Sequence, residues 1–202
     1  MDSEAAIVVA IGQAYLEEGL KAPAYEAIRE TIGLSLIEAV MLLTPWLDAE
    51  KCNRVALGYR RIYSARRSAP ALFPGVYETL TALRAAGYRL AVATGKSQVG
   101  LRQALDDTGL GGLFVTTRTA DCSEPKPSPK MLLEIMAELE LGPDEALMIG
   151  DTEYDLAMAQ AAGMRRAGVS YGTHPVSRLL SFEPDFVLNH IRELLEQLRM
   201  LN

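Results

Sequence analysis

The sequence has few of the features that mark secreted, membrane-spanning or nucleic-acid-binding proteins. It contains two cysteines, Cys52 and Cys122, which lie far apart and form no CxxC motif, so we expect reduced thiols in an intracellular protein. The apolar run at 5–11 is too short to span a bilayer, and acidic residues precede it instead of the basic leader of a signal peptide. The chain has no basic tract and a formal net charge of −6, which argues against binding to nucleic acid or anionic membranes. These absences predict a cytoplasmic globular protein.

The first third of the chain has no strand pattern and predicts helices throughout. The segment 23–33 begins at a proline and ends at a glycine, as is usual for a helix, and Ser35 is a suitable cap for the helix that follows. The predicted helices cover residues 3–19, 23–33, 35–44 and 48–67. We therefore predict a separate helical domain at 3–69, followed by a proline-rich boundary.

From Pro70 onward, helices alternate with short apolar strands. The predicted strands cover residues 88–94, 113–117, 145–150, 165–170 and 185–188. This alternation is typical of βαβ units in a parallel sheet covered by helices on both faces. We therefore predict an α/β fold with a Rossmann-like core at 70–202. In such sheets ligands bind beyond the carboxyl ends of the strands, so the residues directly after each strand are the candidates for a site.

The first of these strand ends supplies a hydroxyl group and backbone N–H groups. Thr94, Gly95 and Lys96 lie where the strand 88–94 gives way to a helix, and this arrangement suits a phosphate cradle. The alternative is that Thr94 or Ser97 only caps the helix. For these residues taken alone, we favour that alternative.

The loop after the next strand holds a lysine between two prolines. Proline fixes its own φ and disfavours helix in the residue before it, so we expect Lys126 on a stiff, extended loop. An ammonium group held there could neutralise phosphate and carboxylate charge. The alternative is an ordinary surface lysine in a turn.

The third strand end supplies two carboxylates. Asp151 directly follows the strand 145–150, and Asp155 comes one helical turn later, so both can face the same point. Carboxylates with few nitrogen or sulfur ligands suit Mg²⁺. The alternative is that Asp151 caps the helix and Asp155 pairs with a lysine. Because successive strand ends supply a hydroxyl, an ammonium group and carboxylates, one shared site is the better interpretation.

Three segments in this order resemble known motifs. "LAVATGKS", "KPSP" and "GDTEYD" are similar to the second, third and fourth motifs of the haloacid dehalogenase superfamily, above all of its phosphoglycolate phosphatase-like hydrolases. The resemblance implies a Mg²⁺-dependent phosphomonoester hydrolase that acts on a small phosphorylated metabolite, as a monomer or homodimer. It implies that the helical domain is a cap inserted after the first strand of the core.

The resemblance also implies a role for each candidate residue. Thr94 would bind a phosphate oxygen together with the N–H groups of Gly95 and Lys96. Lys126 would stabilise the nucleophile and the transferring phosphoryl group. Asp151 would ligate Mg²⁺, and Asp155 would ligate it or orient its water.

The sequence departs from the family in one motif. The family begins with an apolar strand followed by DxDGT, whose first aspartate attacks phosphorus. This chain starts "MDSEAA", in which Asp2 and Ser3 resemble only the tail of that motif, and we expect Asp2 to cap the first helix. We therefore expect the chain as given to be nearly inactive and to lack the first core strand, between 88–93 and 146–149. A gene start placed too late, or a shortened chain, is the favoured explanation.

Other interpretations stay open. The protein could be a non-catalytic protein that binds phosphate or a phosphometabolite, or a phosphomutase or dehalogenase of the same superfamily; dehalogenases do not require Mg²⁺, so "GDTEYD" counts against them. The loop 31–36, Arg60 and Arg61 could contact substrate, but a turn and a solvated helix face are the favoured interpretation. We expect His174 and His190 to be loop or surface residues.

Overall fold

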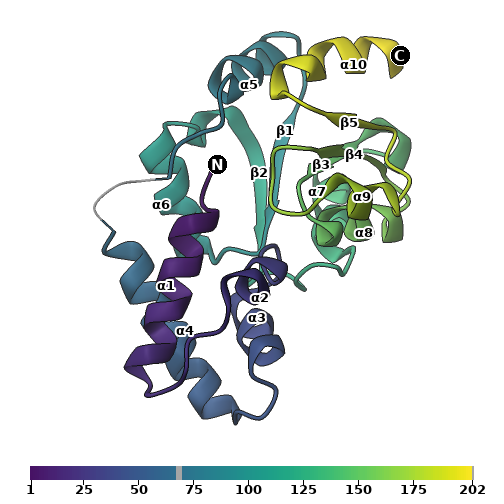
Figure 1. Cartoon of the computed structure of the whole chain (residues 1–202). Coiled ribbons are helices and arrows are strands. Elements are labelled where there is room, and N and C mark those ends of the chain that lie inside the picture. Colours follow the sequence, from purple (N-terminus) through teal and green to yellow (C-terminus); the bar gives the residue numbers. More distant parts are fainter. Residues whose placement is uncertain (67–69, 202) are drawn as a thin grey trace.

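The computed structural model describes residues 1–66 and 70–201. The first part contains four helices: α1 (Glu4–Glu17), α2 (Tyr25–Glu30), α3 (Leu36–Leu43) and α4 (Ala49–Ser64). They lie together in the lower part of Figure 1. The end of the last predicted helix, at 67, and the boundary of the predicted helical domain, at 69, lie outside the described residues.

Local capping explains where two of these helices begin. Ser35 and Glu38 form a capping box at the start of α3, and the Asp48 side chain accepts a hydrogen bond from Lys51 N–H (2.7 Å) at the start of α4. The expectation that Asp2 caps α1 is wrong, because Ser3 occupies that position and makes no capping hydrogen bond. Asp2 instead donates its N–H to the carbonyl of Ala71 (2.8 Å), which ties the start of the chain to the second part.

The four helices enclose a hydrophobic core of their own. Its buried members come from all four helices and are Val8, Ile11, Ala14, Tyr15, Ile28, Val40, Cys52 and Val55. The buried Tyr15 hydroxyl is satisfied by the Thr44 hydroxyl (3.0 Å). A separate core means that this segment can keep its shape while it presents one end to the rest of the molecule.

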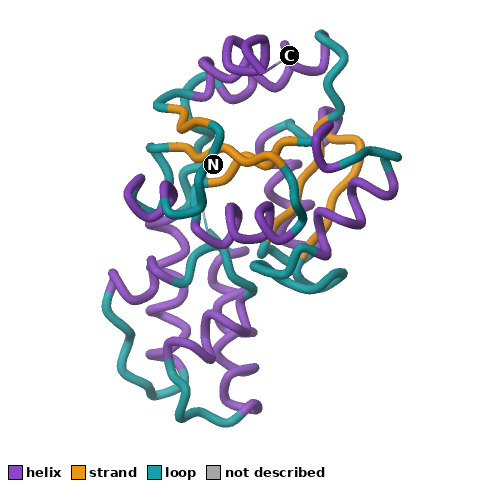
Figure 2. Tube along the Cα trace, turned by 90° about the vertical axis from the view of Figure 1, so that its right-hand side faces the viewer, coloured by secondary structure: helices purple, strands orange, loops and turns teal. Residues whose placement is uncertain are grey.

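The second part alternates helices and strands, and all five predicted strands form. The strands are β1 (Leu90–Thr94), β2 (Phe114–Thr119), β3 (Leu147–Gly150), β4 (Arg165–Val169) and β5 (Phe186–Leu188). The helices are α5 (Val76–Ala85), α6 (Gln98–Thr108), α7 (Lys130–Glu138), α8 (Glu153–Ala161), α9 (Val176–Leu180) and α10 (Leu194–Leu201). In Figure 2 the strands all lie in the upper part of the molecule, away from the four-helix segment. The short helix α9 is not predicted by the sequence.

Helices cover both faces of the sheet, as predicted. Successive strand residues point to opposite faces, and β3 shows this directly. Met148 packs into a core formed with α7 and α8, whereas Leu147 and Ile149 pack into another core with residues of α5 and α10. No helix in the described ranges is long and apolar enough to cross a membrane.

The parallel strands form two groups. β1 pairs with β2, and β3 pairs with β4, which pairs with β5; every pairing is parallel. Within residues 1–66 and 70–201, β1 and β3 do not pair with each other. Residues of both strands line a cavity of about 1090 Å³ instead. The sequence predicts a missing strand at this position, and direct pairing of β1 with β3 would have contradicted it.

Candidate active site

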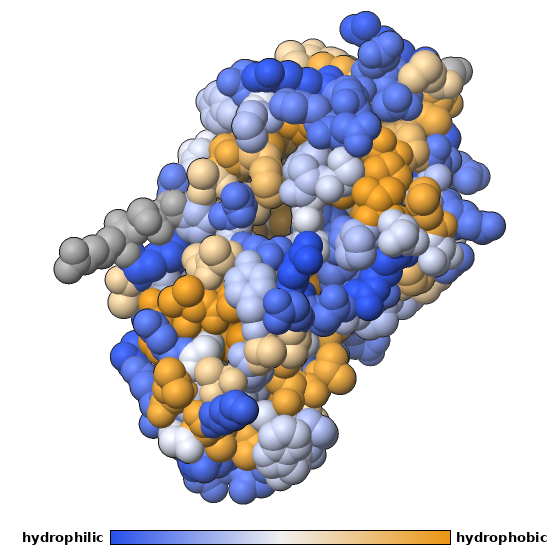
Figure 3. Space-filling view, in the orientation of Figure 1, coloured by the Kyte–Doolittle hydropathy of each residue, from blue (hydrophilic) through white to orange (hydrophobic). Residues whose placement is uncertain are grey.

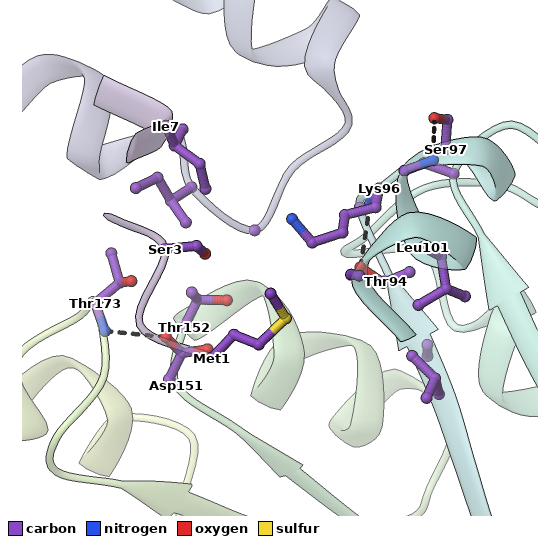
Figure 4. Close-up of a pocket in the computed structure, with 18 of the residues that line it drawn as sticks. Met1, Ser3, Ile7, Thr94, Lys96, Ser97, Leu101, Asp151, Thr152 and Thr173 are labelled. Atoms are coloured by element: carbon purple, nitrogen blue, oxygen red, sulfur yellow. Dashed lines mark hydrogen bonds between the residues drawn. The ribbon is translucent and has the colours of Figure 1, made fainter. Parts of the chain in front are cut away.

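The cavity lies where the helical segment meets the carboxyl ends of β1 and β3. It is lined by Thr94 to Ser97 after β1, by Gly150 to Thr152 after β3, and by the loop 31–35 from the helical segment. Figure 3 shows a hollow near the centre of this face, with apolar side chains in and above it and polar side chains below it. The Met1 side chain also enters the cavity, close to Asp151 (Figure 4). The geometry therefore brings together the strand ends that the sequence singled out.

At the end of β1 the structure shows which of Thr94 and Ser97 caps the helix and which lines the cavity. Ser97 caps α6, because its hydroxyl accepts a hydrogen bond from Gly100 N–H (3.3 Å). Thr94 is not the cap and lines the cavity, where its hydroxyl accepts the N–H of Lys96 (3.2 Å). The Thr94 side chain is therefore available to a ligand in the cavity.

Gly95 lets the loop 31–35 approach the end of β1 closely. A Cβ on Gly95 would collide with the carbonyl oxygen of Leu34 and lie 2.8 Å from that of Gly33. Any side chain larger than hydrogen would push the helical segment away from the strand end. Gly95 thus allows the short distance between the loop 31–35 of the helical segment and the end of β1.

Lys126 is not a surface lysine. Only 6% of it is exposed, and its Nζ lies 2.5 Å from Oδ1 of Asp155, which is 4% exposed. The second carboxylate oxygen of Asp155 accepts hydrogen bonds from the N–H (3.0 Å) and hydroxyl (2.7 Å) of Thr152, which caps α8. Three donors therefore hold Asp155, and Asp155 holds Lys126 at the cavity.

Asp151 is held by the loop that follows β4. Its Oδ2 accepts the N–H of Thr173 (3.0 Å), and its carbonyl accepts the N–H of His174 (3.0 Å). A Cβ on Gly172 would collide with the Asp151 side chain, so this close contact requires glycine. Sequence reasoning missed this loop, and the signal that could have found it is its position directly after the predicted strand 165–170.

His174 lies in the loop before α9, as expected, but it is buried rather than on the surface. Only 1% of it is exposed, because it packs edge-on against the ring of Tyr154 (5.6 Å between centroids). Its Nδ1 accepts the N–H of Glu153 (3.1 Å). Burial lowers the pKa of His174, which favours the neutral ring that this hydrogen bond requires. His174 therefore supports the start of α8 beside Asp151.

The carboxylates of Asp151 and Asp155 suit a Mg²⁺ ion that is also bound by a phosphate group. Within the described ranges no three or more His, Cys, Asp or Glu side chains are grouped as a complete metal site. Asp155 is already engaged by three donors, whereas Oδ1 of Asp151 has no hydrogen bond from the described residues. Mg²⁺ is commonly held by one or two carboxylates, waters and substrate phosphate. Asp151 is thus the better direct ligand of the two.

This chain matches one protein family and several relatives that are named as phosphatases. The family described as haloacid dehalogenase-like hydrolase matches residues 1–169. The protein named probable phosphatase IndB of Dickeya dadantii (strain 3937) is 34% identical over 199 residues, which are 96% of this chain and 86% of the relative. The pyrophosphatase PpaX of Bacillus velezensis (strain DSM 23117 / BGSC 10A6 / LMG 26770 / FZB42) is 33% identical over 151 residues, 74% of this chain and 70% of that protein.

Two further matches agree with these. A phosphoglycolate phosphatase of Vibrio vulnificus (strain YJ016) is 36% identical over 126 residues, which cover 62% of this chain and 55% of that protein. A crystal structure named as a haloacid dehalogenase-like hydrolase from Bacteroides fragilis superposes with a TM-score of 0.88 at 27% identity, covering 96% of this chain and 93% of the other. The order of the strand-end residues, the parallel strands with helices on both faces and these matches agree. The chain belongs to the haloacid dehalogenase-like hydrolases.

Proposed function

We propose that this chain provides the phosphate-binding and metal-binding parts of a Mg²⁺-dependent phosphatase for a small phosphorylated metabolite. The observation that carries the proposal is the buried pair of Lys126 and Asp155, which lines the same cavity as Thr94 and Asp151. A buried ion pair is costly to desolvate. Its position beside a hydroxyl and a second carboxylate suits the positioning and charge neutralisation that phosphoryl transfer requires.

In this proposal the residues after β1 bind the phosphoryl oxygens. The Thr94 hydroxyl and the N–H groups of Gly95 and Lys96 donate hydrogen bonds to the phosphate, which takes over the N–H that Lys96 now gives to Thr94. Lys126 stabilises the negative charge of the transferring group. Asp155 keeps the Lys126 ammonium group in place.

The metal belongs beside Asp151. Asp151 ligates Mg²⁺ directly, and Asp155 contributes by holding Lys126 or by orienting a water. A bound Mg²⁺ would neutralise charge on the phosphoryl oxygens. Thr173 and Gly172 keep Asp151 turned into the cavity.

A nucleophile is not evident around the cavity. The acidic residues that line it are Asp2, Glu4, Asp121, Asp151 and Asp155. None of the first three follows a strand in the required place, and Asp121 already accepts hydrogen bonds from Gln98 N–H and the Thr119 hydroxyl. We infer that the attacking aspartate stands on a further strand outside these 202 residues, which would fit between β1 and β3. The chain as given would then be nearly inactive.

The helices α1–α4 act as the cap in this proposal. They correspond to the predicted domain 3–69, and residues 70–202 form the core domain. The loop 31–35 closes the cavity above Gly95, and the Tyr154 hydroxyl donates to the carbonyl of Glu30 (2.9 Å), so cap and core touch next to the site. Phosphoglycolate, sugar phosphates, nucleotides and pyrophosphate are the candidate substrates. A cytoplasmic location and a monomeric or homodimeric state stay predictions.

The test is Mg²⁺-dependent hydrolysis of p-nitrophenyl phosphate by two forms of the protein. One form is the 202-residue chain, and the other carries an added N-terminal apolar strand that ends in DxDGT. We expect hydrolysis by the extended form alone, and its loss in the extended Lys126→Met variant. Robust turnover by the 202-residue chain would show that its nucleophile lies within it.

A non-catalytic phosphate-binding protein is the second candidate, and the lack of an evident nucleophile favours it. It predicts that both forms bind inorganic phosphate with Mg²⁺ and that neither hydrolyses the ester. Isothermal titration with inorganic phosphate, run beside the hydrolysis assay, separates the two candidates.

A further inference from the structure

The Lys96 side chain points from the end of β1 into the cavity (Figure 4). Its backbone belongs to the proposed phosphate cradle, but its ammonium group has no role in that proposal. Across residues 1–66 and 70–201, no hydrogen bond or ion pair is made by Lys96 Nζ. Its neighbour is the ring of Tyr63 on α4, whose centroid lies 5.3 Å from Nζ.

The surroundings of Lys96 are positive rather than negative. Arg66 stacks on the same Tyr63 ring (4.2 Å), and it is already paired with Asp107 (3.1 Å). Burial, and in second place the charge of Arg66, lowers the pKa of Lys96 to about 8. No carboxylate among the described residues offsets this cost. A cation–π contact with Tyr63 stabilises the ammonium group by less than its removal from water costs.

Tyr63 provides a second unsatisfied group on the same wall. Its hydroxyl is buried and, although it lies near Ser3, has no hydrogen-bond partner of normal geometry in the described part of the chain. Buried polar groups are nearly always paired. An ammonium group and a hydroxyl, both without partners and both lining one cavity, suit a ligand that accepts hydrogen bonds and carries negative charge.

We propose that Lys96 Nζ and the Tyr63 hydroxyl form a subsite for a second anionic group of the substrate, separate from the phosphate at Thr94. This inference rests on the proposed function, because it takes the Thr94 end of the cavity as the phosphate site. The substrate is then a small molecule with a phosphate ester and a second anion, a carboxylate or another phosphate, a few bonds away. Lys96 and Tyr63 determine specificity and take no part in the transfer itself.

The test compares ligands that differ in the second anion alone. Isothermal titration of the 202-residue chain with Mg²⁺ uses 2-phosphoglycolate against 2-hydroxyethyl phosphate, and pyrophosphate against inorganic phosphate. The first pair tests a carboxylate and the second pair tests a phosphate as the second anion. We expect at least one doubly anionic ligand to bind about tenfold more tightly than its partner, which corresponds to about 1.4 kcal/mol.

Variants then assign the preference to the subsite. Lys96→Met keeps the apolar stem and should reduce the ratio of the two affinities by about tenfold, whereas Lys96→Arg should retain most of it. Tyr63→Phe should reduce the ratio by a smaller factor. Lys130→Met is the matched control, because Lys130 is exposed and does not line the cavity. Thermal unfolding checks that each variant is folded.

The outcomes separate this inference from the proposed function. A ratio near one in the unmodified chain, for both ligand pairs, would overturn the subsite and leave the phosphate site standing. A ratio that Lys96→Met leaves unchanged would do the same. If the chain binds none of the four ligands, both the subsite and the proposed function are wrong.

Discussion

The buried ion pair at the cavity should show a strong asymmetry between its two members. Replacing Asp155 by Asn leaves the Lys126 ammonium group buried without the one carboxylate that pairs with it among the described residues. Removing one member of a buried pair costs about 3–5 kcal/mol, because the other charge is left uncompensated. Replacing Lys126 by Met leaves Asp155 with two donors from Thr152 and a place in the first turn of α8. The charge of Asp155 is therefore partly satisfied, and we expect Lys126→Met to lower the free energy of unfolding by about 1–3 kcal/mol.

Urea unfolding followed by circular dichroism at pH 7 measures these differences. The set consists of Asp155→Asn, Lys126→Met and the double variant, which closes a double-mutant cycle. The double variant should be more stable than Asp155→Asn alone, because it removes the stranded ammonium group. Glu124→Gln is the control, since Glu124 pairs with Lys130 at 3.6 Å on the surface and should change the midpoint little.

Two results would refute this reasoning. Asp155→Asn could lower the free energy of unfolding by no more than the surface control does, which would mean that water or another group reaches Lys126. Alternatively, Lys126→Met could cost more than Asp155→Asn, which would mean that the Thr152 donors do not satisfy Asp155. The expected losses are a large share of the roughly 5–15 kcal/mol that stabilises a domain, so they are well within the range of the assay.

Four further predictions follow from single features of the cavity. The chain should bind Mg²⁺ weakly without an added anion, because of the two carboxylates after β3 Asp155 is already held by three donors and Asp151 alone keeps an open oxygen among the described residues; tight binding in a titration with MgCl₂ alone would contradict this. Gly95→Ala should lower the unfolding free energy by about 1–3 kcal/mol through its collision with Leu34, whereas Gly112→Ala, with open space around it, should change it little. The pKa of Lys96 is about 8 in the folded protein against an ordinary value of 10.5. Between these pH values the unfolded chain holds more protons than the folded chain, so the free energy of unfolding should rise with pH. The same rise in Lys96→Met would show that another group causes it. An N-terminal extension with an apolar strand should raise the melting temperature by pairing with the free edges of β1 and β3, and equal melting temperatures would show that the missing-strand reasoning is wrong.

The sequence alone determined the elements, because each depends on neighbours a few residues away. The alternation of helical and apolar segments predicts all five strands near their observed positions, and caps such as Ser35 mark the starts of helices. The exception is α9, whose five residues are too few to show a helical period. The same local reasoning singled out Thr94, Lys126, Asp151 and Asp155 as candidates, since parallel strands place their carboxyl ends at one edge, and all four line the cavity.

Only the tertiary structure decided how these residues are used. Lys126 and Asp155 are 29 positions apart, and nothing local in either segment shows that they form a buried pair. Other contacts likewise join segments far apart in the chain. They bury His174, place the Tyr63 ring beside Lys96 and bring Gly95 against Leu34. The physical reason is that hydrogen-bond geometry and helix periodicity act over a few residues, whereas burial and charge pairing depend on which distant surfaces are packed together.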